Sequence, residues 1–580
     1  MAIFILVFLT SVAALLFHKL LISKLYPKLL DGLPHNRVSA NRIFGDVSDV
    51  VAYTSKTQEQ SEALFLINQK ANSPIAQFLT PSISNSSVLI DDPREAEDIL
   101  KRRSREFDRS GTTARFFKYL LPQCSLVQYT TPSLKAQKRL WADSMSTKFL
   151  RRVVAPNVHR TATCLIELWR LKATQSEENI FETKKDFDDA AMDIMWAAIL
   201  GSDLGILKDQ MTALEECPGS GADHRDKSGV KVAAPREAAE SSRAMFLDTM
   251  EFIDDTVGAF TKSGMASLRL KLIKLTPRYR RVQRTMDAEL RRLMSSSRDR
   301  FQKLLENDVD GEEYETCAMD LVLRRDLVAA MKEGRVAHDD VKQGRAMLEE
   351  LMLLLMAGID STGNTLAWCV KFLSLYPTVQ FELRAALQST FSIQGSALSP
   401  GDIIDTNIPY LDAFLQETLR FAVTAGAIIR RATVDTQILG YAIPAGTDII
   451  MNTRVFRRPI PISEELRSVS SQDAQRKRPR GGIEGQSGEN LETFEPRRWL
   501  YDDESEKEAF DPDALPTLVF GGGLRGCFGR RLAMQDLRIF VVLLVLNFEF
   551  LPLPGELRDL TGEEAVFRHP KQALVKLKIL

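Results

Sequence analysis

The stretch LVFGGGLRGCFGRRLAMQD, residues 518–536, is the part of the sequence that decides the fold. Gly521, Gly523 and Gly526 spell G-x-G-x-x-G, a loop that can hold the pyrophosphate of a dinucleotide. The same glycines surround a single cysteine, Cys527, which has chemistry of its own. The two interpretations predict different folds, so the rest of the chain has to separate them.

A dinucleotide site would need two β-α-β units around the glycine loop. Residues 517–520 (TLVF) suit a short strand, the following apolar run suits a helix, and Glu549 lies about where a ribose-binding acid should be. However, only a short tail follows Glu549, and no upstream segment alternates strands and helices as this fold requires. The sequence therefore argues against a nucleotide-binding fold.

The cysteine interpretation starts from the position of Cys527, in a glycine-rich loop just before a long helix. Backbone N–H groups and the positive end of the helix favour a thiolate, which is an axial ligand for haem iron. Gly523 and Gly529 would let the backbone approach a flat macrocycle, Arg525 would pair with a propionate, and Phe520 would shield the sulfur. The alternative is a buried cysteine in an ordinary turn.

The composition is that of a globular protein with a sizeable core. The chain has 580 residues, of which 44% are hydrophobic and 26% charged, and its formal net charge is −1. A balanced charge gives no general attraction to nucleic acid, so no nucleic-acid partner is expected. The six cysteines form no C-x-x-C pair, which argues against a disulfide scaffold and a structural zinc site.

The amino terminus predicts a membrane anchor over residues 1–28. Residues 2–17 (AIFILVFLTSVAALLF) carry no charge, and Lys19, Lys24 and Lys28 follow them. By the positive-inside tendency, these lysines would hold the rest of the chain in the cytosol. The alternatives are a cleaved leader or a helix buried in the protein.

One catalytic domain is expected over residues 29–580, mainly α-helical with small β-sheets. Residues 96–391 have long amphipathic periodicities, interrupted by a polar loop over 217–242. Strand-like alternation appears late, over 436–453. Residues 467–490 are poor in hydrophobes and rich in Gly, Ser and charge, which predicts a disordered surface insertion.

The stretch around Cys527 resembles the haem-binding signature of the cytochrome P-450 family, F-x-x-G-x-R-x-C-x-G. The five positions of this pattern are occupied by Phe520, Gly523, Arg525, Cys527 and Gly529. The match continues at Leu532, Ala533 and Asp536. The resemblance implies the P-450 fold, here preceded by an N-terminal transmembrane helix, with haem b (iron protoporphyrin IX) as cofactor and Cys527 as the ligand of its iron.

The family's E-x-x-R motif is matched by Glu417 and Arg420, which are neighbours on one helical face. The resemblance implies that Arg498, in FEPRRWL, joins them in a buried structural triad behind the cysteine loop. Arg497 stands where the family usually has glutamate. The alternative for Glu417 and Arg420 is an ordinary surface ion pair, which contributes little.

A third motif lies inside the apolar run LMLLLMAGIDSTGNTLAW, residues 351–368. It matches the family's A/G-G-x-D/E-T-T/S at Ala357, Gly358, Asp360, Ser361 and Thr362. The resemblance implies that Gly358 leaves room for oxygen, and that the acid and a hydroxyl relay protons to it. Ser361 replaces the usual threonine and lacks the β-branch that restricts the rotamer.

Two further segments are expected to contact the haem propionates. Arg430 lies in the segment after the E-x-x-R helix, which resembles its family counterpart. Residues 133–145 resemble more weakly the early helix that carries W-x-x-x-R or H-x-x-x-R. Arg139 is the residue assigned there, with Lys135, Lys138 and Trp141 as further candidates.

By this resemblance, the protein is a monooxygenase that inserts one atom of O2 into a hydrophobic small molecule, a secondary metabolite of polyketide, terpenoid or steroid-like type. Electrons would come from NADPH through NADPH-cytochrome P-450 reductase, with cytochrome b5 as a second candidate donor. The expected location is the endoplasmic reticulum membrane, with one membrane pass and a cytosolic catalytic domain. The alternatives are an isomerase or dehydratase that acts on a peroxide without O2, and a haem carrier or sensor.

The resemblance also implies which segments face the substrate and the electron donor. Residues 107–117, 245–274 and 422–429 would line the open side of the haem. Arg530 and Arg531, just beyond the cysteine, would meet an acidic partner protein.

Overall fold

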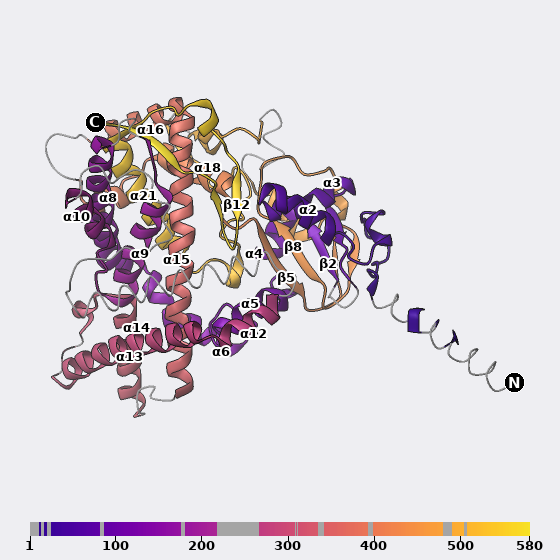
Figure 1. Ribbon diagram of the computed structural model, residues 1–580, viewed down its shortest axis with the longest axis horizontal. Helices are drawn as coiled ribbons and strands as arrows, with labels where there is room; N and C mark the ends of the chain where they lie inside the picture. Colours follow the sequence, from indigo (N-terminus) through magenta and orange to yellow (C-terminus); the bar gives the residue numbers. More distant parts are fainter. Residues whose placement is uncertain are drawn as a thin grey trace.

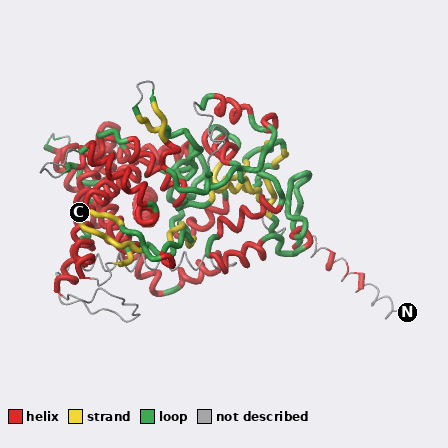
Figure 2. The backbone as a smooth tube through the Cα atoms, turned by 90° about the horizontal axis from the view of Figure 1, so that it is seen from above, coloured by secondary structure: helices red, strands yellow, loops and turns green. Residues whose placement is uncertain are grey.

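The computed structural model shows a mainly helical protein with one larger and several small β-sheets (Figures 1 and 2). This agrees with the expected fold class. The structure describes residues 11, 12, 15, 17–19 and 25–580, without 82–85, 176–179, 217–265, 308, 310, 335–340, 392–397, 479–489 and 504–506. The polar loop predicted over 217–242 therefore lies outside the described residues.

The helical part is built around α15, which spans Val341–Leu375. Helix α9 packs along it, and Figure 1 shows the two side by side. Almost every residue of α9 is buried, including the large apolar side chains of Phe187 and Trp196. The long helices are α8 (Ala155–Gln175), α9 (Lys184–Leu200), α13 (Pro277–Glu306), α14 (Ala318–Glu333), α16 (Pro377–Thr390), α18 (Pro409–Ala422) and α21 (Arg530–Asn547).

Shorter helices surround this core and connect it to the sheets. They begin at side-chain caps where the sequence supplies them; for example, Thr131 caps α6 and Asp92 caps α4. The shorter helices are α2 (Val47–Thr57), α3 (Gln60–Lys70), α4 (Pro93–Lys101), α5 (Gly111–Leu120), α6 (Pro132–Trp141), α10 (Ile206–Glu216), α12 (Ala266–Leu275) and α17 (Pro400–Asp405).

A five-stranded sheet lies on the other side of the molecule, with α2 and α3 beside it (Figure 1). Only the pairing of β2 with β8 is parallel, and Val88 and Ile449 are opposite each other there. The strand order is β1 (Ile75–Phe78), β2 (Ser87–Ile90), β8 (Asp448–Asn452), β5 (Ala427–Ala432) and β3 (Phe107–Arg109). The predicted late strands thus join strands from the first quarter of the chain.

The remaining sheets are small and antiparallel. The most relevant one is the hairpin of β12 (Gly562–Glu564) and β13 (Arg568–Pro570), which lies between α15 and the larger sheet (Figure 1). The others are β6 (Thr436–Ile438) with β7 (Tyr441–Ile443), β9 (Leu500–Asp502) with β10 (Glu508–Phe510), and β14 (Leu574–Ile579) between β11 (Phe548–Phe550) and β4 (Ile180–Glu182).

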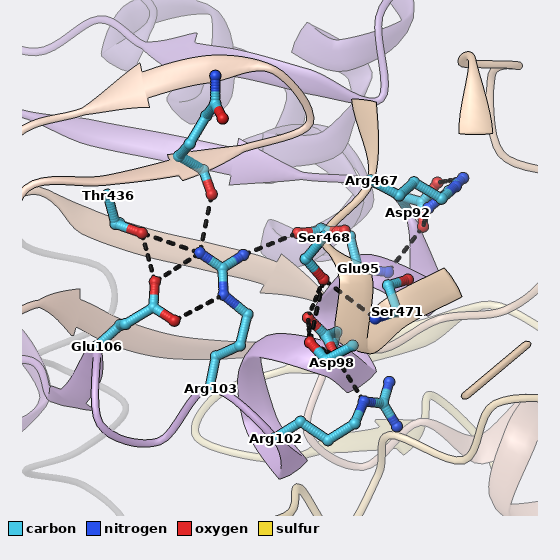
Figure 3. A network of polar contacts seen from close by, with 12 residues as sticks. Asp92, Glu95, Asp98, Arg102, Arg103, Glu106, Thr436, Arg467, Ser468 and Ser471 are labelled. Carbon is cyan, nitrogen blue, oxygen red and sulfur yellow. Dashed lines mark hydrogen bonds and ion pairs between the residues drawn. The ribbon is translucent and has the colours of Figure 1, made fainter. Parts of the chain in front are cut away.

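The prediction of a disordered insertion over residues 467–490 is wrong for its first part. Residues Val469–Arg476 form helix α19, which docks on α4. Figure 3 shows the network that holds it: Arg467 makes two bonds to Asp92, at 2.6 and 3.0 Å, and Ser468 donates to Asp98 at 2.6 Å. Polar composition misled the prediction because the partners of these side chains lie about 370 positions away in the sequence. Residues 479–489 lie outside the described residues.

Most of the anchor predicted over residues 1–28 also lies outside the described residues. Within the part of the chain that the structure describes, no helix has both the length and the apolar character needed to cross a bilayer.

Candidate active site

A cavity of about 630 Å³ lies between α15, the loop around Cys527, β5 and the turn of the β12–β13 hairpin. Cys527 lines it, and so does the polar motif of α15. The sequence motifs around residues 360, 430 and 527 therefore converge on one space. The substrate-facing segments predicted over 107–117 and 422–429 reach it through Phe117, Thr424, Ala425 and Ile428. The third, 245–274, is largely outside the described residues.

The loop that carries Cys527 is fixed by its own backbone. The N–H of Cys527 donates to the carbonyl of Phe520 at 2.7 Å. Gly523 has φ +61°, and a Cβ there would lie 2.8 Å from the carbonyl oxygen of Leu100 in α4. Only glycine fits this position without strain. The two glycines predicted to approach a macrocycle therefore differ: Gly523 packs against α4, and Gly529 lines the cavity.

The thiol of Cys527 opens onto the cavity, although the surrounding walls desolvate it. Burial raises its pKa, and the backbone N–H of Gly529 and the cations Lys138 and Arg530 only partly offset this effect. The backbone N–H of Gly529 thus favours the thiolate, as expected, but burial outweighs it in the polypeptide by itself. A metal ion would supply the missing charge, because a coordinating thiol is deprotonated.

Four cations gather on one wall of the same cavity: Arg109, Lys138, Arg430 and Arg525. Burial, together with the neighbouring guanidinium groups, lowers the pKa of Arg109 to about 9 and that of Arg430 to about 10. Among the described residues, Nε of Arg109 is buried without a hydrogen-bond partner. This cluster has an excess of positive charge that two carboxylates would reduce.

Arg525 and Arg430 lie on this wall as the sequence predicted, but Arg139 does not. Arg139 is exposed and is absent from the residues that line the cavity, whereas its neighbour Lys138 is among them. One position along a helix turns a side chain by about 100°, so the phase of α6 selects Lys138. Lys138 also donates to the carbonyl of Leu524 in the cysteine loop at 2.5 Å. Arg109 was missed because no motif marked it.

Arg525 is held by protein groups on the cavity wall. It donates to the carboxylate of Asp108 at 3.2 Å and to the carbonyl of Gln128 at 2.5 Å. Asp108 is further held by Thr130, whose N–H and hydroxyl both donate to it. These contacts fix the guanidinium beside the cavity without neutralising the rest of the cluster.

Glu417, Arg420 and Arg498 form one buried cluster. The two oxygens of Glu417 accept bonds from Arg420 at 2.7 and 2.8 Å, from Arg498 at 3.1 Å and from Trp499 at 2.9 Å. Burial alone would raise the pKa of Glu417, but the two arginines outweigh it and the pKa lies below its ordinary value. The alternative of a surface ion pair is wrong, because the Glu417 side chain is 0% exposed. Arg497, by contrast, is exposed and pairs with Glu382.

The polar motif of α15 lines the same cavity as Cys527. Asp360, Ser361 and Thr362 all line it, and the hydroxyl of Ser361 donates to the carbonyl of Ala357 at 2.6 Å. Gly358 lines the cavity as well, so its expected role of leaving room there stays a prediction. A Cβ on Gly358 would lie 2.2 Å from Cε of Met195, so this glycine admits a side chain of α9.

Asp536, the last position of the signature, is buried in α21 one turn beyond the cavity-lining Ala533. Within the described chain, neither of its carboxylate oxygens has a hydrogen-bond partner. Burial raises its pKa well above the ordinary value, which favours the neutral form of the acid.

These residues fit a haem group. Cys527 would hold the iron, and the four cations would hold the two propionates. A Cβ on Gly529 would meet no protein atom within 4 Å, so this position leaves the cavity open beside the cysteine. When bound, haem would supply the activation of O2, which no side chain can perform.

Comparisons with known proteins agree with this assignment. The family model described as Cytochrome P450 matches residues 57–458 and 489–577. A cytochrome P450 monooxygenase of Pestalotiopsis microspora, named GME11363, is 30% identical over 96% of this chain and 95% of its own length. The monooxygenase TRI13 of Fusarium sporotrichioides is 30% identical over 95% of each chain. The monooxygenase xilC of Penicillium crustosum is 31% identical over 99% of this chain and 95% of its own.

A solved structure supports the fold. A crystal structure of a cytochrome P450 superposes with a TM-score of 0.60 over 96% of this chain and 99% of the other, at 16% identity. The chain therefore has the fold of that cytochrome P450. The chain belongs to the cytochrome P450 family and is an enzyme of its monooxygenase type.

Proposed function

We propose that this enzyme inserts one oxygen atom from O2 into a hydrophobic secondary metabolite, with Cys527 as the thiolate ligand of haem b. The single observation that carries the proposal is the cavity itself. It is lined both by Cys527 and by Asp360, Ser361 and Thr362 of α15.

The residues of α15 would move protons within the cavity. Asp360 would take up a proton and pass it to a hydroxyl that faces the reacting centre. Ser361 would be that hydroxyl: its own proton is donated to the carbonyl of Ala357, so its lone pairs can accept a proton from the cavity side. Thr362 is almost fully buried, which favours a supporting role for its hydroxyl.

The walls above this centre favour an apolar substrate. The side chains there are Phe117, Leu126, Leu353, Leu354, Ala425 and Phe567. They offer few polar groups, so affinity would come from the burial of hydrophobic surface. A polyketide, terpenoid or steroid-like skeleton would match this surface.

Electrons would come from NADPH through a separate reductase, with cytochrome b5 as a second donor. The surface beside the cysteine loop carries two exposed arginines, Arg530 and Arg531, that suit an acidic partner. Arg530 also stacks over the ring of Phe520, 5.6 Å from its centroid, so it links that surface to the loop. Location at the endoplasmic reticulum, through an anchor in residues 1–28, is part of the same proposal and is supported by the sequence of residues 2–17.

The function is tested with purified enzyme, reductase, NADPH and O2 labelled with heavy oxygen. Candidate metabolites are incubated and the masses of the products are read. One labelled oxygen atom per product molecule is expected. A product that forms from a peroxide without O2 or NADPH would instead support the isomerase or dehydratase alternative.

A further inference from the structure

A second group of polar side chains lines the same cavity on the side of α9. It comprises Lys184 and Asp188 of α9, Asn364 of α15 and His569 of β13. No sequence motif marked these residues, and the proposed function does not use them. Their position between α9, α15 and the β12–β13 hairpin raises the question of what they supply to the cavity.

Asp188 is placed against α15 by two features. Nζ of Lys184 lies 2.6 Å from its Oδ1. A Cβ on Gly363 would lie 2.4 Å from the same oxygen, so the carboxylate rests on the one residue of this turn that has no side chain. Gly363 directly follows Thr362, and Asp188 thus sits beside the polar motif of the proposed active site.

Helix stability does not explain this pair. Lys184 is the first residue of α9, where a positive charge opposes the helix dipole. A lysine that precedes its acid by four positions is also the weaker order for an ion pair on a helix. The side chains of Lys184 and Asp188 are 23% and 28% exposed. The carboxylate is thus largely desolvated, which costs free energy.

Asn364 continues the polar line along α15. It is 3% exposed, and within the described residues its Oδ1 has no hydrogen-bond partner. It lies one turn beyond Asp360, so the two side chains share a face of the helix. An amide oxygen that lines a cavity and lacks a protein donor is a natural acceptor for an ordered water.

The charged groups that face Asp188 come from two elements. Burial raises its pKa, Lys184 of α9 and His569 of β13 lower it, and Asp186 of α9 raises it. Nδ1 of His569 lies 3.1 Å from the carbonyl oxygen of Pro570, which leaves Nε2 for other partners. Asp188 therefore has a titratable neighbour on the hairpin side and the motif of α15 on the other.

We propose that Asp188 supplies protons to Asp360, and that Lys184 and Gly363 hold its carboxylate in place for this role. His569 as imidazolium gives a proton to Asp188, and the acid passes it through water held by Asn364 to the carboxylate of Asp360. Bulk solvent reprotonates His569, so no net charge remains in the cavity. The inference rests on the proposed function, because it needs a reaction that consumes protons at Asp360.

The test compares Asp188→Asn with Asp189→Asn in the haem-loaded enzyme with its reductase. Asp189 is the next residue of α9, bonds Gln210 and is not among the residues that line the cavity. In Asp188→Asn, the product formed per NADPH should fall at least about tenfold, hydrogen peroxide should rise, and the solvent isotope effect should increase. Asp188→Glu should restore part of the coupling, and Asp189→Asn should match the parent enzyme.

A readout without turnover separates proton supply from a loss of structure. In infrared spectra of the resting protein, one carboxyl band that titrates with pH should vanish in Asp188→Asn and remain in Asp189→Asn. Gly363→Ala should displace the same carboxylate and reproduce the uncoupling, which keeps the inference testable if Asp188→Asn does not fold.

If Asp188→Asn and Gly363→Ala both keep wild-type coupling and an unchanged solvent isotope effect, this inference is overturned and the proposed function is not affected. A parent enzyme that forms no oxygenated product would instead count against the proposed function.

Discussion

Replacing Glu417 by glutamine tests whether the buried cluster holds the protein together. The carboxylate accepts bonds from Arg420, Arg498 and Trp499 and from the backbone N–H of Glu495. An amide keeps one oxygen and turns an NH2 group towards the remaining donors, so at least two charge-assisted bonds are lost. Each contributes about 1.5–3 kcal/mol, and breaking a buried pair costs about 3–5 kcal/mol. The free energy of unfolding of Glu417→Gln should therefore be about 3–5 kcal/mol lower than that of the parent protein.

Glu382→Gln is the matched control, because Glu382 pairs with the exposed Arg497 on the same short turn that carries Arg498. It should cost about 1 kcal/mol or less. Urea unfolding followed by circular dichroism at neutral pH measures both variants. Since the pKa of Glu417 is lowered in the fold, its contribution is present above the unfolded pKa and is lost as the pH falls through the folded pKa. If Glu417→Gln and Glu382→Gln lowered the free energy of unfolding equally, the buried cluster would contribute no more than a surface ion pair.

Three further substitutions follow from the site. Gly523→Ala should lower the free energy of unfolding of the haem-free chain by about 1–2 kcal/mol, from the left-handed backbone at this position alone. Gly529→Ala should change the free energy of urea unfolding by less than about 1 kcal/mol and should lower the haem content instead. The reverse pattern would contradict the assigned roles of the two glycines. Asp536→Asn should stabilise the fold at pH 7 by at most about 4 kcal/mol, because it removes an acid whose charged form is disfavoured by burial. That gain should shrink towards pH 4 in thermal unfolding, and a loss of stability at pH 7 would show that Asp536 is ionised. Lys138→Ala should release more haem during gel filtration than Arg139→Ala, and equal retention would argue against Lys138 as a propionate contact.

The sequence predicted the cysteine loop and the pair of Glu417 and Arg420 because short motifs determine them. Phe520 and Cys527 lie seven positions apart and are joined by one backbone bond. Glu417 and Arg420 lie one turn apart on a single helix, so their pairing follows from helical spacing. For contacts of this kind, local spacing carries most of the geometry.

The sequence failed where contacts depend on distant packing. Helix phase decides between Lys138 and Arg139, and the weak motif around them did not define that phase. The contact of Gly358 with Met195 of α9 was not predicted, because it depends on how two helices pack. Asp188 belongs to no motif or predicted segment, and Arg109, although inside the predicted segment 107–117, was not singled out; only the assembled cavity shows that both side chains reach it.

The central claim is that Cys527 binds the haem iron through its sulfur. The most direct measurement is the absorption spectrum of the reduced, carbon monoxide-bound protein for the parent enzyme, for Cys527→Ser and for the control Cys124→Ser, which changes a buried cysteine outside the loop. We expect the red-shifted band of thiolate-ligated haem in the parent enzyme and in Cys124→Ser, and we expect its loss in Cys527→Ser. Survival of that band in Cys527→Ser would contradict the account.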